Sequence, residues 1–286
     1  MRGSRWYWAP WREARARLMR SPFLVHVLRL VRRVCGKLRG LWQVGLAEGV
    51  GGWLDRLTLG DAPVLAGLRA KLAAFVHARG PVWFKIRIST ALLVAACLAM
   101  VFSPGGGVGT PSAWVALGMG FSWVGDALLM RYPPARRAVR QYFLWSIAFF
   151  AAAQCCYIRM LYGLYAGAGD GTHWPMWLAV LIYAGTAMVA MCAFILPNEH
   201  QPLVLRLAAI PYALLVSWMA GSAVAVCVVT VGRGALLMAG GLLFYLSDAL
   251  VTQARLGSVR LRYADFWIWV TYAPAQLFLI LGAAHM

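Results

Sequence analysis

The chain alternates between long apolar runs and short polar breaks from about residue 86 to its end. Each run approaches or exceeds the length of about 20 residues that a helix needs to cross a bilayer. The runs lack the period-two alternation of a membrane barrel, and the breaks are rich in Gly, Pro and charged residues. The pattern therefore predicts an all-α bundle of seven transmembrane helices, at roughly 86–103, 111–130, 141–163, 175–196, 203–230, 234–252 and 263–284.

Composition agrees with a lipid environment. Hydrophobic residues make up 62% of the 286 residues and charged residues only 13%, which is more apolar surface than a soluble domain of this size buries. Arginines gather in the breaks after the second, fourth and sixth predicted helices, so these breaks should face the cytoplasm. This orientation places the N-terminal segment inside and the C-terminus outside. The excess of Arg over Lys, 24 to 3, and the lack of an organelle signal favour a bacterial inner membrane.

The N-terminal segment, residues 1–84, differs from the predicted transmembrane domain, residues 85–286. The first 87 residues hold 17 of the 27 Lys and Arg but 4 of the 9 acidic residues, a net charge of about +13. Arg alternates there with Leu, Val and Trp at helical spacing, which predicts a helix lying on an anionic lipid surface, or a disordered segment. No nucleic-acid-binding motif accompanies the charge, so no nucleic-acid partner is expected. An open alternative is that the start codon is placed too early.

Cysteine and histidine do not indicate a cofactor. The six Cys form no C-x-x-C pair, and the five His lie in the N-terminal segment, in predicted breaks or at the chain end. Neither a disulfide framework nor a metal site is predicted, and no His stands near a Ser or Cys nucleophile. We expect a protein without metal or other cofactor.

Two aspartates interrupt the apolar runs. Asp126 lies in GMGFSWVGDALLM (118–130) and is the only acidic residue between Asp61 and Asp170, and Asp248 lies in GGLLFYLSDALVT (240–252). A charge facing lipid costs about 3 kcal/mol or more, so such residues face the bundle interior and usually carry function. The pair is therefore the candidate catalytic site. The alternative is that each Asp only hydrogen-bonds a neighbouring helix, through Ser122, Ser247 or a Tyr.

The two segments also align with each other at an offset of 122 residues. Ten identities fall in 41 positions, and they include both aspartates, Gly118 with Gly240, and Gln154 with Gln276. Helices one to three would then correspond to helices five to seven, with the fourth as connector. Both copies would run in the same direction, which makes a 3+1+3 parallel repeat. The aspartates would lie at matching depth on opposite sides of a central cavity.

Three motifs resemble those of the YhhN family of membrane proteins, which includes the lysoplasmalogenases. They are F-S-x-x-G-D (residues 121–126), L-F-Y-L-S-D (243–248) and Y-x-x-A-Q (272–276), and the resemblance runs from about Phe84 to Leu281. In this chain Lys85 is followed by Ile86 where the family usually has Lys-Pro, and Gln154 stands where it tends to have His. The family usually has eight helices, so the resemblance makes eight the alternative to about seven, with the basic segment in place of the first.

The resemblance implies hydrolysis of the vinyl-ether bond of a lysoplasmalogen, a lysophospholipid with an ethanolamine or choline headgroup. The products are a fatty aldehyde and a glycerophospho-alcohol. A proton must reach an alkene carbon, and water must then add to the resulting oxocarbenium ion. One acid and one base are needed, and two carboxyl groups sharing one proton in a partly dry cavity can divide these roles. Asp126 and Asp248 are the expected pair, and the sequence does not say which is the acid.

Other polar residues are expected to bind the substrate or position water. Several lie one helical turn from an aspartate or from each other. Lys85, directly before the first predicted helix, could hold the phosphate group of the substrate. Close packing at helix contacts is the alternative for each of them. The expected substrate-binding residues are Lys85, Ser122, Gln154, Tyr157, Tyr245, Tyr272 and Gln276.

Two functions from other classes stay open at this point. A transporter that couples lipid or small-solute movement to protonation would use the same aspartates, and a membrane protein without turnover would carry them incidentally. No predicted helix is interrupted by Pro and Gly together in both halves, as substrate sites of transporters often are. The sequence does not indicate an oligomeric state or a headgroup preference.

Overall fold

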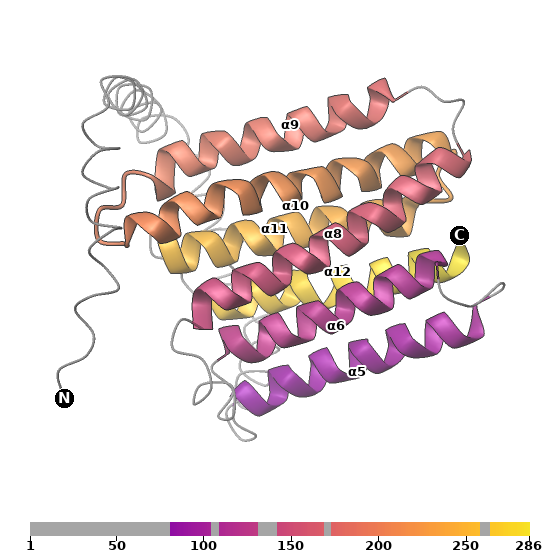
Figure 1. Cartoon of the computed structure of the whole chain (residues 1–286), viewed down its shortest axis with the longest axis horizontal. Coiled ribbons are helices and arrows are strands. Elements are labelled where there is room, and N and C mark those ends of the chain that lie inside the picture. The colour runs from indigo at the N-terminus through magenta and orange to yellow at the C-terminus, as the bar shows by residue number, and fades with distance from the viewer. Residues whose placement is uncertain (1–80, 104–108, 131–141, 169–172, 258–263) are drawn as a thin grey trace, which may run out of the picture. The chain divides into compact units, whose positions relative to one another are not determined.

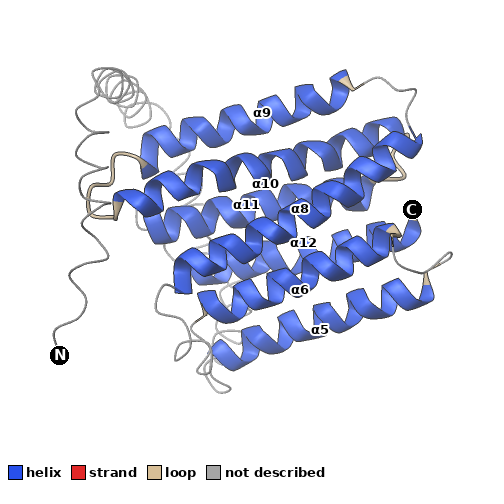
Figure 2. Ribbon diagram, viewed as in Figure 1, coloured by secondary structure: helices blue, strands red, loops and turns tan. Residues whose placement is uncertain are grey.

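The computed structural model describes residues 81–103, 109–130, 142–168, 173–257 and 264–286. Within these residues the protein has seven long helical spans and no strand, and each span is long and apolar enough to cross a membrane (Figures 1 and 2). This confirms the predicted all-α membrane bundle. The helices are α5 (Pro81–Phe102), α6 (Pro111–Leu129), α8 (Tyr142–Ala168), α9 (Trp174–Ala190), α10 (Leu203–Val229), α11 (Ala235–Leu256) and α12 (Ala264–His285). The fourth span is α9 together with the π-helical turn that follows it. The basic segment up to residue 80, with its predicted surface helix, lies outside the described residues.

Turn chemistry at the breaks fixes where several helices begin. Thr110 is the N-cap of α6, and its hydroxyl accepts a hydrogen bond from the Ala113 amide at 3.3 Å. Proline follows in the first turn of α6 and of α9, where its missing N–H leaves no helical hydrogen bond unmade. The helix starts therefore follow from the Gly- and Pro-rich breaks that the sequence shows.

The fourth membrane span changes its winding near its end. After Ala190 the chain continues as a π-helical turn, η2 (Met191–Ile195), where the sequence predicts one uniform helix over 175–196. A π-helical turn inside a long helix widens the local backbone and often marks a functional region. This irregularity has no signature in the hydropathy pattern, because the residues there are as apolar as their neighbours.

The helices pack in an order that places the two halves of the chain side by side. α6 packs against α5 and α8, α11 packs against α10 and α12, and α12 also packs against α5 and α6 (Figure 1). A Cβ on Gly118 would meet the Tyr157 ring, and one on Gly240 would meet Ala275 and Leu279. Tyr157 and Leu279 are themselves 122 residues apart, so the aligned glycines receive neighbours at aligned positions. The internal repeat stays a prediction with which these contacts agree.

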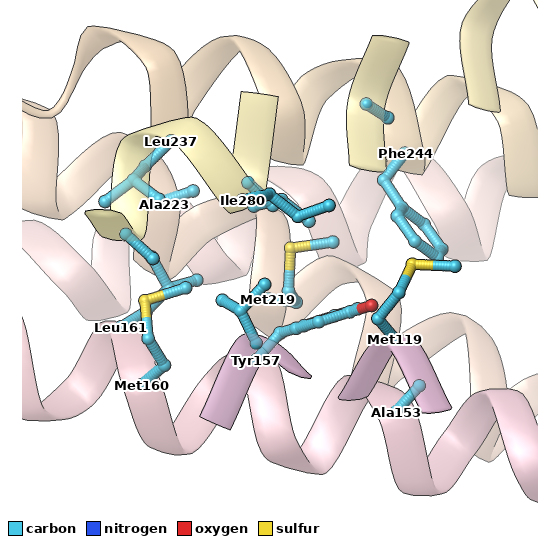
Figure 3. Packing of buried hydrophobic residues seen from close by; sticks show 14 of the residues in the cluster. Met119, Ala153, Tyr157, Met160, Leu161, Met219, Ala223, Leu237, Phe244 and Ile280 are labelled. Carbon is cyan, nitrogen blue, oxygen red and sulfur yellow. The ribbon is translucent and has the colours of Figure 1, made fainter. Parts of the chain in front are cut away.

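A buried core joins the helices at mid-length. The ring of Tyr157 lies among Met119, Met219 and Phe244 (Figure 3), and its centroid is 6.0 Å from that of Phe244 in an edge-on arrangement. All four side chains have no exposed surface. Many large apolar side chains point outward instead, as expected of a surface that faces lipid tails, among them Phe102, Trp174, Leu181 and Val228. This buried core fixes the positions of α6, α8, α10 and α11 relative to one another.

Candidate functional site: a cavity with two aspartates

Asp126 and Asp248 line one cavity, which we call the Asp cavity. It lies among α5, α6, α8, α10, α11 and α12 and has about 870 Å³ of space, counting its open mouth. The charged residues on its wall are Lys85, Asp126, Asp248, Arg255 and Asp265. Asp126 comes from α6 and Asp248 from α11, so two different helices bring the carboxyl groups to the wall of one cavity. The tertiary structure thus places both members of the predicted catalytic pair in one cavity.

Each aspartate is held by hydroxyl groups of other helices. Asp126 is 3% exposed, and its carboxyl group accepts hydrogen bonds from Ser89 of α5 at 2.6 Å and from Tyr272 of α12 at 2.8 Å. Asp248 is partly exposed and accepts a hydrogen bond from Tyr212 of α10 at 2.7 Å. These contacts fix both carboxyl groups at the cavity wall. A Tyr side chain thus connects each Asp to a neighbouring helix. Such a hydrogen bond is what the alternative, purely structural interpretation of the aspartates predicted.

Sequence reasoning missed Ser89 and Tyr212. Both lie in apolar runs, where a single hydroxyl does not stand out. The offset of 122 contained a signal, since it aligns Tyr212 with Thr90, the neighbour of Ser89. In each half, the first helix of the predicted repeat supplies a hydroxyl donor to the Asp of the second helix.

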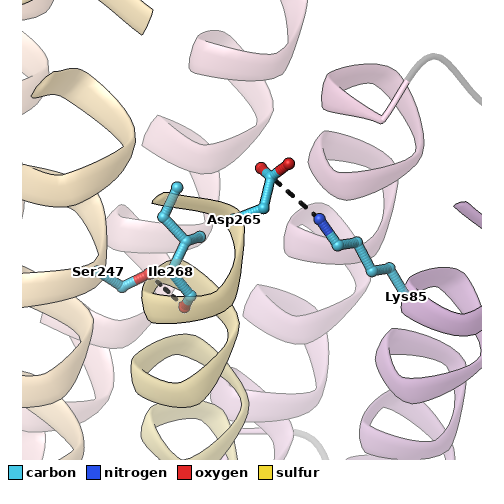
Figure 4. Close-up of polar contacts among 4 residues, drawn as sticks. All are labelled: Lys85, Ser247, Asp265 and Ile268. Carbon is cyan, nitrogen blue, oxygen red and sulfur yellow. Dashed lines mark hydrogen bonds and ion pairs between the residues drawn. The ribbon is translucent and has the colours of Figure 1, made fainter. Parts of the chain in front are cut away.

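Positive charge lies at the cavity wall beside Asp126. The Lys85 ammonium is 3.7 Å from the Asp265 carboxylate (Figure 4) and 5.6 Å from the centroid of the Trp269 ring. Arg255 of α11 lines the same cavity. The Asp265 side chain is 75% exposed, so its ion pair with Lys85 is weak and exchangeable. An anionic group that entered the cavity would compete with Asp265 for the lysine.

Three expected substrate-binding residues form a separate cluster behind the cavity wall. The Tyr157 hydroxyl donates to the Gln276 carbonyl oxygen at 2.9 Å and lies 3.3 Å from the Ser122 hydroxyl, and the Gln276 amide donates to Ser122 at 3.3 Å. All three side chains are fully buried, and none belongs to the cavity wall. Gln276 is one turn from Tyr272 on α12, so the cluster fixes the part of α12 that presents Tyr272 to Asp126.

The structure places Gln154 and Tyr245 differently from the others. Gln154 is fully buried, and neither polar atom of its amide makes a hydrogen bond within the described part of the chain, although the Tyr212 hydroxyl is close by. The Tyr245 hydroxyl lies 2.8 Å from the Thr186 hydroxyl and donates to the Tyr183 carbonyl oxygen at 3.1 Å, both on α9. Tyr245 therefore does not reach the Asp cavity. Among the expected substrate-binding residues, only Lys85 and Tyr272 line it.

The comparison with known protein families matches the part of the chain that contains the Asp cavity. The model of the YhhN family matches residues 82–283. The chain belongs to the YhhN family. The match confirms the resemblance drawn from three short motifs, and it covers the described helices from the first turn of α5 to the last turn of α12. No curated protein and no solved structure matches the chain. Every residue of the Asp cavity lies within the YhhN region.

Proposed function

We propose that this YhhN protein is a membrane-embedded hydrolase that cleaves the vinyl-ether bond of lysoplasmalogens. The products are a fatty aldehyde and a glycerophospho-alcohol such as glycerophosphoethanolamine or glycerophosphocholine. The observation that carries the proposal is the pair of carboxyl groups, Asp126 and Asp248, on the wall of one cavity between membrane-spanning helices. Membership of a family that includes lysoplasmalogenases supports the choice of reaction.

The chemistry requires one acid and one base close together. A vinyl ether hydrolyses when a proton adds to the alkene carbon further from oxygen, which leaves an oxocarbenium ion at the carbon bonded to oxygen. A carboxylate beside this cation stabilises it and orients the attacking water, much as paired carboxyl groups act in glycoside hydrolysis. Water then adds, and the hemiacetal collapses to aldehyde and alcohol. A well-placed general acid or base contributes about 10²- to 10⁴-fold to such a rate.

The cavity wall also suits the polar half of a lysolipid. Lys85 and Arg255 provide two positive charges for the phosphate diester, at the same wall as the aspartates. Ser89, Tyr212 and Tyr272 hold the carboxyl groups in fixed positions, which lowers the cost of arranging them during the reaction. The glycerophosphate group would thus lie near the basic residues, with the ether oxygen directed toward the aspartates.

The test is aldehyde release by the purified protein in detergent or liposomes. We expect aldehyde from lysoplasmalogen and none from the saturated alkyl-ether analogue, because only the vinyl ether forms an oxocarbenium ion by protonation. The analogue is a matched control, since it differs only in the double bond. A protein that releases no aldehyde in either medium but moves lipid or solute in response to a proton gradient would be a transporter.

A further inference from the structure

A second cavity adjoins the Asp cavity and is mostly apolar. It lies between α9 with its π-helical turn η2, α10 and α11, and it has about 500 Å³ of space, counting its open mouth. We call it the lateral cavity. Three residues, Tyr212, Asp248 and Thr252, line both cavities, whereas Asp126 lines only the Asp cavity. Asp248 and its hydrogen-bond donor Tyr212 therefore stand at the junction.

Small side chains make room in the lateral cavity. Four alanines line it, and two of them, Ala190 on α9 and Ala249 on α11, are exposed at the outside of the bundle. α9 lies at the edge of the bundle beyond α10 (Figure 1). The wall of the cavity thus includes residues that reach the outer, largely apolar surface of the bundle. The wall is mostly apolar, and the hydroxyl of Tyr245 on it is already bonded to α9.

The proposed function gives this cavity an occupant. We propose that the lateral cavity holds the alkenyl chain of the lysolipid while the glycerophosphate group occupies the Asp cavity, and this proposal rests on the proposed function. The vinyl ether is the junction between the polar and apolar halves of the substrate, just as Asp248 and Tyr212 are the junction between the two cavities. A chain can enter from the bilayer through the opening beside Ala190 and Ala249, without passing through water.

This placement divides the chemical roles. The carbon that takes the proton is the one that continues into the chain, so it lies on the side of the lateral cavity, where only Asp248 is present. Asp248 gives its proton to that carbon, and the alkene electron pair forms the new C–H bond. Water adds to the carbon bonded to oxygen and loses a proton to Asp126. In the collapse, the C–O bond breaks, Asp126 returns this proton to the leaving oxygen, and the hemiacetal hydroxyl reprotonates Asp248.

A substitution that narrows the lateral cavity tests the chain site. Ala213→Phe fills the cavity from α10, whereas Leu214→Phe, one residue further, changes a side chain that is 43% exposed on the outer surface. We expect Ala213→Phe to lower kcat/KM at least tenfold for a long-chain (hexadecenyl) lysoplasmalogen, mainly through KM. The value for a short-chain (butenyl) analogue should change less than about twofold. Leu214→Phe should change neither value.

Equal losses on both chain lengths, or no loss on either, would overturn the chain site. Binding of the long-chain saturated alkyl-ether lysolipid separates this result from a failure of the proposed function, because this ligand is not hydrolysed. We expect Ala213→Phe alone to weaken its binding at least tenfold. If the wild-type protein binds it and Ala213→Phe does not weaken binding, the chain lies elsewhere, whether or not aldehyde is released.

Azide tests the division of roles. As an anion, azide adds to an oxocarbenium ion without a base, and the product is an α-azido ether that mass spectrometry identifies. We expect azide to raise turnover of Asp126→Asn at least tenfold and to leave Asp248→Asn unchanged, because the latter lacks the acid that forms the cation. Rescue of Asp248→Asn instead, or of neither variant, would overturn the assignment of Asp248 as the acid.

Discussion

Replacing either Asp126 or Asp248 by asparagine should lower kcat for aldehyde release by about 10²- to 10⁴-fold. Asparagine keeps the size of the side chain and can still accept the hydrogen bonds from Ser89, Tyr272 or Tyr212, but it neither gives nor takes a proton in this reaction. The double variant should be only slightly slower than the slower single variant, because the two groups act in one proton-transfer sequence and their effects do not add. Steady-state kinetics on folded, monodisperse protein gives the measurement.

Asp265→Asn is the control for these variants. It removes a carboxylate from the same cavity, but one whose side chain is 75% exposed and 3.7 Å from Lys85. We expect it to change kcat less than about tenfold, since a solvent-exposed ion pair contributes little. If Asp126→Asn or Asp248→Asn kept more than half of the wild-type kcat while folding normally, the paired-carboxyl mechanism would be wrong.

The two glutamines that align at the offset of 122 should respond differently to removal of their polar groups. Gln276→Leu should lower the free energy of unfolding by about 1 to 3 kcal/mol, because it leaves the buried Tyr157 and Ser122 hydroxyls without their amide partner. Gln154→Leu should be neutral or stabilising by about 1 kcal/mol, since its buried amide makes no hydrogen bond within the described residues. Denaturant unfolding in detergent micelles measures both.

Gln154→Leu and Gln276→Leu control for each other. Both positions are fully buried, both lie on the third helix of their half in the predicted repeat, and the substitution is the same. Equal destabilisation by the two leucines would mean that Gln154 has a partner of comparable strength, for which the neighbouring Tyr212 hydroxyl is the candidate. Gln276→Leu should also lower kcat moderately, because the cluster fixes Tyr272, which donates to Asp126.

The arrangement of the two cavities has a consequence for access to the substrate. A lysolipid already lies in the bilayer with its chain among the lipid tails. In the proposed arrangement it would enter from the side, where Ala190 of α9 and Ala249 of α11 line the lateral cavity, and the basic residues of the Asp cavity would receive its headgroup. The π-helical turn at Met191–Ile195 forms part of the lateral wall. Its widened backbone changes the direction of the side chains at this wall relative to a regular helix.

Several features of the protein were determined by sequence alone. Hydropathy over about 20 residues is a local property, so the seven membrane spans follow from the chain without knowledge of its packing. The cost of a charge in lipid predicted that Asp126 and Asp248 face the interior, and both do line an interior cavity. Three short motifs were enough to indicate the YhhN family, whose model matches residues 82–283.

Only the tertiary structure decided which side chains meet. Asp126 and Tyr272 are 146 residues apart, and whether their side chains touch depends on how far α6 and α12 are rotated about their axes. A rotation of a few tens of degrees leaves hydropathy unchanged but exchanges one hydroxyl partner for another. For this reason the sequence did not predict that Ser89 and Tyr212 donate hydrogen bonds to the aspartates. It also did not predict that Tyr245 bonds α9, or that Gln154 and Gln276 differ in their hydrogen bonds despite their alignment. The lateral cavity arises in the same way, from gaps left by small side chains on three helices that the sequence lists separately.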